Sequence, residues 1–120
     1  MIERLEIDGV HMSVDDRLRK YVMRKIGRLD RYVPRQARAS VHVEVKLKED
    51  RAKDQQVCTC EVIVHLPQDT FALKETSPNM YTSVDIVEEK LKGHLKKYKD
   101  LHASPKIHRR LWARFWRSGA

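Results

Sequence analysis

The chain has 120 residues and a formal net charge of +8 at pH 7, a length that suits one domain and excludes two. A hydrophobic fraction of 41% and a charged fraction of 35% are typical of a soluble globular protein with a charged surface. No run approaches the length of a transmembrane helix, and no leading segment resembles a signal peptide. Two cysteines cannot form a disulfide framework, so we expect a cytoplasmic protein.

The positive charge is unevenly distributed along the chain. Residues 103–120 contain five basic residues and no acidic residue. We therefore expect a folded domain over residues 1–102, followed by a basic, aromatic tail over 103–120. The position of the charge, rather than its total, should identify the partner.

The first two elements are predicted from periodicity. Alternation over 5–9 predicts a short strand, and Asp15 is a favourable N-cap for a helix that runs to about Tyr32, before Pro34. Hydrophobic residues recur at helical spacing on one side of this helix: Leu18, Val22, Ile26, Leu29 and Val33. Basic residues occupy the opposite side: Arg17, Lys20, Arg24, Arg28 and Arg31. A merely solvated face normally mixes charges of both signs, so this stripe favours a polyanion such as nucleic acid.

Three more strands follow. Strict alternation predicts strands over 41–48 and 58–66, with a short one over 71–74. The charged segment 49–56 is long enough for a loose hairpin connection, and 67–70 forms another turn. Because the links are short, we expect an antiparallel meander.

A long second helix completes the domain. Ser77 followed by Pro78 is a favourable start, with a hydroxyl cap and a proline in the first turn. Its buried side is predicted to contain Met80, Val84, Val87, Leu91, Leu95 and Tyr98. Its C-terminal half is rich in lysine: Lys90, Lys92, Lys96, Lys97 and Lys99. Two basic helix flanks side by side would form a cationic groove that reads phosphates and helical shape.

The predicted architecture is α+β, in the order β-α-β-β-β-α. Both helices should pack on one face of a four-stranded sheet, as in double-stranded-RNA-binding domains.

Residues for catalysis or metal binding are not evident in the sequence. Cys58 and Cys60 are too closely spaced for a usual zinc motif, and they share the apolar face of their strand, so we interpret them as buried hydrophobic residues. Glu88 and Glu89 are interpreted as solvated helix residues. We expect no enzyme activity, no cofactor, no metal and no small-molecule substrate.

Three stretches resemble the short ribosome hibernation-promoting factors, the family of ribosome-associated inhibitor A, formerly called sigma-54 modulation proteins. They are Leu5-Glu6-Ile7-Asp8-Gly9 with the helix that follows, Asn79-Met80-Tyr81, and the basic helix end around Lys97-Tyr98-Lys99. The resemblance covers about four-fifths of the chain and implies the same β-α-β-β-β-α fold. It also implies binding to the small ribosomal subunit near the decoding region, where messenger RNA and tRNA sites would be blocked and translation inhibited.

The resemblance further implies which residues contact ribosomal RNA: Lys25, Arg28, Lys90, Lys97 and Lys99. Tyr81 could instead pack against the sheet. The chain departs from the family at Asn79, where an acid is usual. We expect a short member of the family, without the second domain of the long members. We expect a protein that is monomeric off the ribosome.

Two other functions stay open. A generic double-stranded RNA-binding module would track any A-form duplex, and a protein-interaction module would act on the transcription machinery. The tail could stack on RNA through its aromatic residues, bind a protein or a membrane surface, or merely add charge. Its accessory RNA-binding candidates are Arg109, Arg110 and Arg114.

Overall fold

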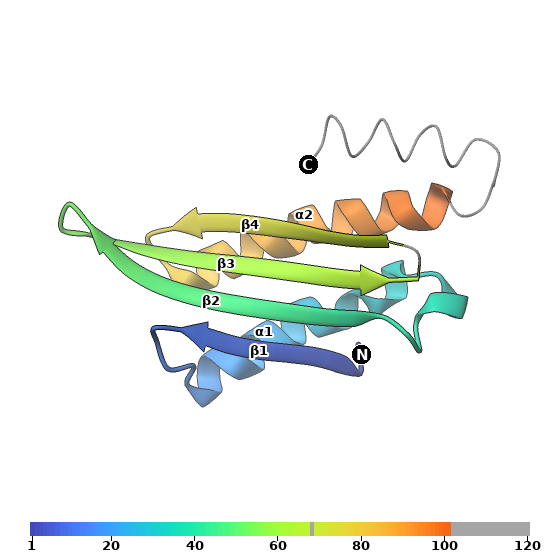
Figure 1. The fold of residues 1–120 in the computed structure, drawn as a ribbon, viewed down its shortest axis with the longest axis horizontal. Coiled ribbons are helices and arrows are strands. Elements are labelled where there is room, and N and C mark those ends of the chain that lie inside the picture. Colours follow the sequence, from blue (N-terminus) through green and yellow to red (C-terminus); the bar gives the residue numbers. More distant parts are fainter. Residues whose placement is uncertain (68, 102–120) are drawn as a thin grey trace.

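The computed structural model describes residues 1–67 and 69–101 (Figure 1). The tail over 103–120, with its candidates Arg109, Arg110 and Arg114, lies outside the described residues. The elements run in the order β1 (Arg4–Val10), α1 (Asp16–Gly27), η1 (Arg28–Tyr32), η2 (Arg35–Ala37), β2 (His42–Ala52), β3 (Gln55–Leu66), β4 (Asp69–Ser77) and α2 (Met80–Leu101). The predicted β-α-β-β-β-α order is therefore confirmed, with two short 3₁₀ turns, η1 and η2, added after α1.

The four strands form one mixed sheet in the order β1-β2-β3-β4. β1 pairs with β2 in parallel, as expected of two strands joined through a crossover helix. The pairs β2–β3 and β3–β4 are antiparallel, which confirms the predicted meander. In the centre of the sheet, Val45 pairs with Ile7 on one side and with Val62 on the other, so hydrophobic residues of neighbouring strands share one face.

Both helices cover that hydrophobic face of the sheet (Figure 1). The predicted helix stripes are buried, since Val22 and Ile26 of α1 and Val84 and Leu91 of α2 have no exposed surface. Each fully buried side chain of this size contributes roughly 1.5–3 kcal/mol. Burial of the two stripes therefore fixes which sides of α1 and α2 remain outside.

The opposite face of the sheet is polar and carries balanced charge. Across the four strands, Asp8 pairs with Lys46, Lys46 with Glu61, and Glu61 with Lys74. Lys48 forms an ion pair with Asp50 on the same strand, at 3.4 Å. Alternating charges in neighbouring strands attract one another, so this outer face needs no external counter-charge.

The start of each helix tests a predicted cap. Asp15 caps α1 as expected, and its carboxylate accepts a hydrogen bond from the Leu18 amide at 2.7 Å. The prediction for α2 was wrong, because Asn79 and not Ser77 is the cap. The Asn79 side-chain oxygen accepts hydrogen bonds from the amides of Tyr81 and Thr82, at 2.8 and 3.3 Å. Ser77 ends β4 instead.

Three other boundaries differ from the prediction. The first α-helix, predicted to run to about Tyr32, ends at Gly27, and the tighter turn η1 takes its place over Arg28–Tyr32. The segment expected to form a loose hairpin is a continuation of β2 and β3 around a tight turn at Lys53 and Asp54, whose φ angles are 53° and 64°. Such paired left-handed residues form the turn that matches the twist of a hairpin. The fourth strand also extends to Asp69–Ser77, well beyond the short strand predicted over 71–74.

Candidate nucleic-acid interface

The outward side of α1 brings together three of the predicted basic residues. Arg17, Lys20 and Arg24 are exposed and lie one turn apart. Across residues 1–67 and 69–101, none of these three forms an ion pair with a carboxylate. Their charges are therefore available to an external anion.

Two tyrosines join these cations around an open hollow of about 490 Å³, lined by Arg17, Lys20, Tyr21, Arg24 and Tyr81. The rings of Tyr21 and Tyr81 meet edge to face, with centroids 4.9 Å apart. The guanidinium of Arg17 lies 5.9 Å from the Tyr81 ring centroid, and that of Arg24 lies 5.4 Å from the Tyr21 centroid. The hollow thus combines groups that bind phosphate with rings on which a base can stack.

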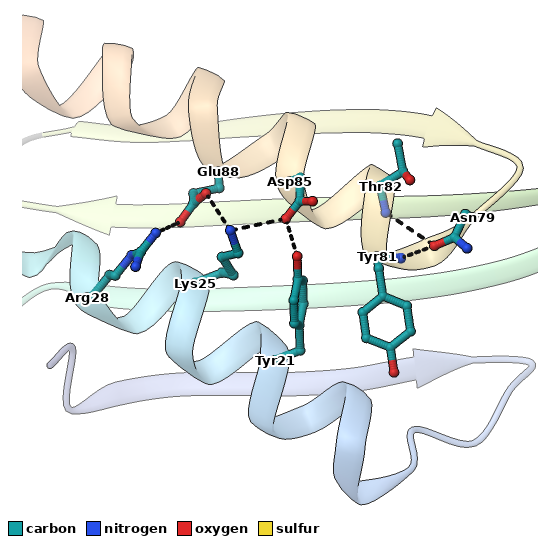
Figure 2. A network of polar contacts seen from close by, with 8 residues as sticks. All are labelled: Tyr21, Lys25, Arg28, Asn79, Tyr81, Thr82, Asp85 and Glu88. Atoms are coloured by element: carbon teal, nitrogen blue, oxygen red, sulfur yellow. Dashed lines mark hydrogen bonds and ion pairs between the residues drawn. The ribbon is translucent and has the colours of Figure 1, made fainter.

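The line of contact between the two helices, which we call the seam, holds a network of paired charges (Figure 2). Its members are Tyr21, Lys25, Arg28, Asp85 and Glu88. The Tyr21 hydroxyl donates to the Asp85 carboxylate at 2.5 Å, and the Lys25 ammonium lies 3.5 Å from both Asp85 and Glu88. The Arg28 guanidinium donates to Glu88 at 3.0 Å. Two cations therefore face two carboxylates.

This network alters the protonation of two of its members. The hydrogen bond to Asp85, with burial, raises the pKa of the Tyr21 hydroxyl above its ordinary value. The charge of Glu88 and, more weakly, that of Asp85 raise the pKa of Lys25, against the opposing effect of burial. Lys25 and Tyr21 therefore both keep their protons at neutral pH.

The seam corrects two predictions. Glu88 is not a solvated residue, because only 7% of its side chain is exposed between the helices. The groove between α1 and α2 is not a continuous cationic channel, because paired charges fill its middle. Lys25 lies within this network with 23% of its side chain exposed, whereas Arg28 keeps 53% exposed and can also reach a ligand.

The predicted basic residues of α2 do not form one group. Lys90 forms an ion pair with Glu75 of β4 at 2.7 Å and so lies away from α1. Lys97 and Lys99 are exposed in the last turns of the helix. Arg31 of η1 lies near a different part of α2, next to Tyr32.

Four residues of this surface were missed as site candidates: Tyr21, Tyr32, Lys92 and Lys96. Tyr32 was considered only as the end of the first helix, and Lys92 and Lys96 only as part of the lysine-rich half of the second. One signal was available for Tyr21, since it lies four residues after Arg17 and three before Arg24, which places all three on one helix side. Nothing in the sequence pairs Tyr32 with Lys92 and Lys96.

The cysteines occupy the positions predicted for them. Cys58 and Cys60 are both buried, and desolvation raises the pKa of the Cys60 thiol to about 12. Within the part of the chain that the structure describes, no group of three or more potential metal ligands is present. Neither of the two described α-helices is long and apolar enough to span a bilayer.

Comparison with known proteins gives the relatives of this chain. The family described as Sigma 54 modulation protein / S30EA ribosomal protein matches residues 5–102. A ribosome hibernation promotion factor of Lactococcus lactis is 37% identical over 97 residues, covering 80% of this chain and 49% of the relative. One from Staphylococcus aureus is 32% identical over 96 residues, covering 80% and 48%. The chain thus spans about half the length of these curated relatives.

Solved structures share the fold. The N-terminal domain of Thermus thermophilus Protein Y superposes with a TM-score of 0.63 at 24% identity, over 78% of this chain and 94% of that one. A ribosomal subunit interface protein from Coxiella burnetii superposes with a TM-score of 0.65 at 23% identity, over 81% and 98%. The match over 5–102, together with the identity to the curated relatives, shows that this chain belongs to the sigma-54 modulation / S30EA family of ribosome hibernation factors.

Proposed function

We propose that the protein binds the small ribosomal subunit at the decoding channel and inhibits translation by occupying the messenger RNA and tRNA sites. The observation that carries this proposal is the hollow beside α1, where three cations that form no ion pair with any described residue surround two tyrosine rings. Family membership supplies the ribosome as the target. We further propose that it acts in the cytoplasm and is monomeric off the ribosome.

The basic side chains and the tyrosine rings of the contact surface would bind different parts of the RNA. Unpaired cations at the hollow would bind phosphates, while Tyr21 and Tyr81 would contact ribose or a base. The proposed RNA-binding residues are Arg17, Lys20, Arg24, Lys25, Arg28, Arg31, Lys90, Lys97 and Lys99, with accessory contacts from Arg109, Arg110 and Arg114. Lys25 and Lys90 would in addition position their helices through the ion pairs that they form.

A salt titration of binding to purified small subunits tests the proposal. The double variant Arg17→Gln/Arg24→Gln removes two unpaired charges from the hollow, so the slope of log affinity against log salt should fall by up to about two units. Affinity should fall roughly 100-fold, since each charge-assisted contact contributes about tenfold. Inhibition of cell-free translation should weaken in parallel.

The matched control is Lys46→Gln/Lys48→Gln, which removes two charges from the outer face of the sheet. Its affinity and salt slope should stay close to those of the original protein. Equal losses of affinity in the two double variants would mean that the attraction is diffuse, and would contradict a defined site. Displacement from the subunit by an arbitrary RNA duplex would favour a generic double-stranded RNA-binding module.

A further inference from the structure

A second cluster of cations surrounds one tyrosine at the far end of the helix pair. Tyr32, the last residue of η1, lies beside the C-terminal half of α2. The distances from its ring centroid are 5.0 Å to the Arg31 guanidinium, 5.2 Å to the Lys96 ammonium and 5.6 Å to the Lys92 ammonium. Two separate segments thus bring three positive charges to one ring.

These three charges lack the compensation found in the seam. Among the described residues, no carboxylate forms an ion pair with Arg31, Lys92 or Lys96. Lys92 and Lys96 are one helical turn apart and repel each other. The Tyr32 ring face attracts cations only weakly, so a bound anion would relieve the repulsion.

The four side chains of the cluster can all donate hydrogen bonds. Arg31 donates to the Tyr32 hydroxyl oxygen at 3.0 Å, which leaves the hydroxyl proton available to another acceptor. Burial opposes the change, but this hydrogen bond and the charges of Arg31, Lys92 and Lys96 lower the pKa of Tyr32. A more acidic hydroxyl is a stronger donor, and donors alone suit a phosphate.

The turn that presents the cluster is held in place by the rest of the fold. The Arg38 guanidinium donates to the carbonyl oxygens of Asp30 and Val33, both at 3.1 Å. These two hydrogen bonds hold the C-terminal end of η1 in place. Leu29 anchors the same turn in the core with 2% exposure, and Tyr32 packs against that core. Little ordering would be needed on binding, which favours affinity.

The cluster is separate from the hollow. Tyr21 and Tyr32 are eleven residues apart, roughly 16 to 19 Å along α1 and η1, and the ion pairs of Lys25 and Arg28 with Glu88 lie between them. A single phosphate group cannot contact both. We propose that Arg31, Tyr32, Lys92 and Lys96 form a second phosphate-binding site, which holds the RNA backbone at a point distinct from the hollow. As a statement about the ribosome, this rests on the proposed function.

Nuclear magnetic resonance of the full chain with the single-stranded probe hexauridylate tests the site without the ribosome. Signals of Tyr32, Lys92 and Lys96 should shift on titration, as should those lining the hollow. Lys92→Gln/Lys96→Gln should abolish the first group of shifts and keep the second. Tyr32→Phe keeps the ring and should weaken binding at the cluster roughly three- to tenfold through loss of one donor.

Binding to small subunits gives the second measurement. Lys92→Gln/Lys96→Gln should lower the salt slope by up to about two units more than the control pair Lys46→Gln/Lys48→Gln. Hexauridylate shifts confined to the hollow, or spread equally over Lys46 and Lys48, would overturn the second site. If Lys92→Gln/Lys96→Gln weakened binding to the subunit but hexauridylate caused no shifts at the cluster, the cluster would contact an acidic protein. That result would also overturn the second phosphate-binding site. Local hexauridylate shifts without any subunit binding would keep the site and refute the proposed function.

Discussion

Lys25 and Arg28 show that a basic residue on this surface can either bind an external anion or pair with a carboxylate of the protein itself. In the sequence both are members of a basic helix. In the structure both form ion pairs with Glu88, which lies almost wholly buried between α1 and α2. Charge reversal at Lys25 would place a third carboxylate beside Asp85 and Glu88, so loss of binding in such a variant would mix unfolding with lost contact.

The contribution of Glu88 to stability can be measured directly. Glu88→Gln keeps the shape of the side chain but removes the carboxylate partner of Arg28 and one of the two carboxylate partners of Lys25. We expect the free energy of unfolding to fall by about 1–2 kcal/mol, between the values for exposed and for fully buried pairs. Urea denaturation would measure it. Glu89→Gln, at the exposed neighbouring position, should change stability by less than about 0.5 kcal/mol. Equal changes in the free energy of unfolding in the two variants would show that the ion pairs of the seam do not stabilise the fold.

The two helices run in the same direction along the sheet, and their starts determine how they meet. Tyr21 contacts the first turns of α2, the Lys25 and Arg28 pairs follow, and Tyr32 meets Lys92 and Lys96 further along. Asn79, the cap of α2, also affects the charge near the hollow. It caps α2 without adding negative charge, so the positive end of the helix dipole remains beside Tyr81 and the hollow.

Substitution of the cap should separate stability from binding. Asn79→Ala removes the acceptor for two amides and should cost about 1 kcal/mol in thermal or urea unfolding. Asn79→Asp keeps the acceptor and should preserve stability, but its negative charge should weaken RNA binding at the hollow several-fold. The cap assignment would be wrong if Asn79→Ala unfolded at the same denaturant concentration as the original protein.

At the scale of the whole molecule, the fold could be predicted because periodicity records which side of each element is buried. The stripes that include Val22 and Leu91 and the alternation around Val45 determine faces without reference to distant residues. The tight turn at Lys53 and Asp54 was missed because it lacks the glycine that usually marks such a turn. The cap of α2 was misassigned by two residues because Ser77 is also a good cap by type.

The candidate site could be predicted only in part. Arg17, Lys20 and Arg24 share one side of one helix, which the sequence records. The partnership of Lys25 with Glu88 depends on how α1 lies against a helix some sixty residues later, as do the contacts of Tyr32. Local pattern therefore located the cations but could not tell which of them were already paired.

Charge is also divided between the two sides of the molecule. The exposed cations of α1 lie on the helix side, whereas the outer face of the sheet alternates positive and negative side chains across neighbouring strands. Such a distribution orients the helix side toward a polyanion. The central claim is that this side occupies the decoding channel of the small ribosomal subunit.

Hydroxyl-radical footprinting of ribosomal RNA in small subunits, with and without the protein, tests that claim most directly. We predict protection of the nucleotides that line the messenger RNA and tRNA channel, lost when tRNA is added first and reduced in Arg17→Gln/Arg24→Gln. Protection unchanged in Lys46→Gln/Lys48→Gln would confirm that the helix side makes the contact. Protection confined to another region of the subunit, with tRNA still able to bind, would contradict the account.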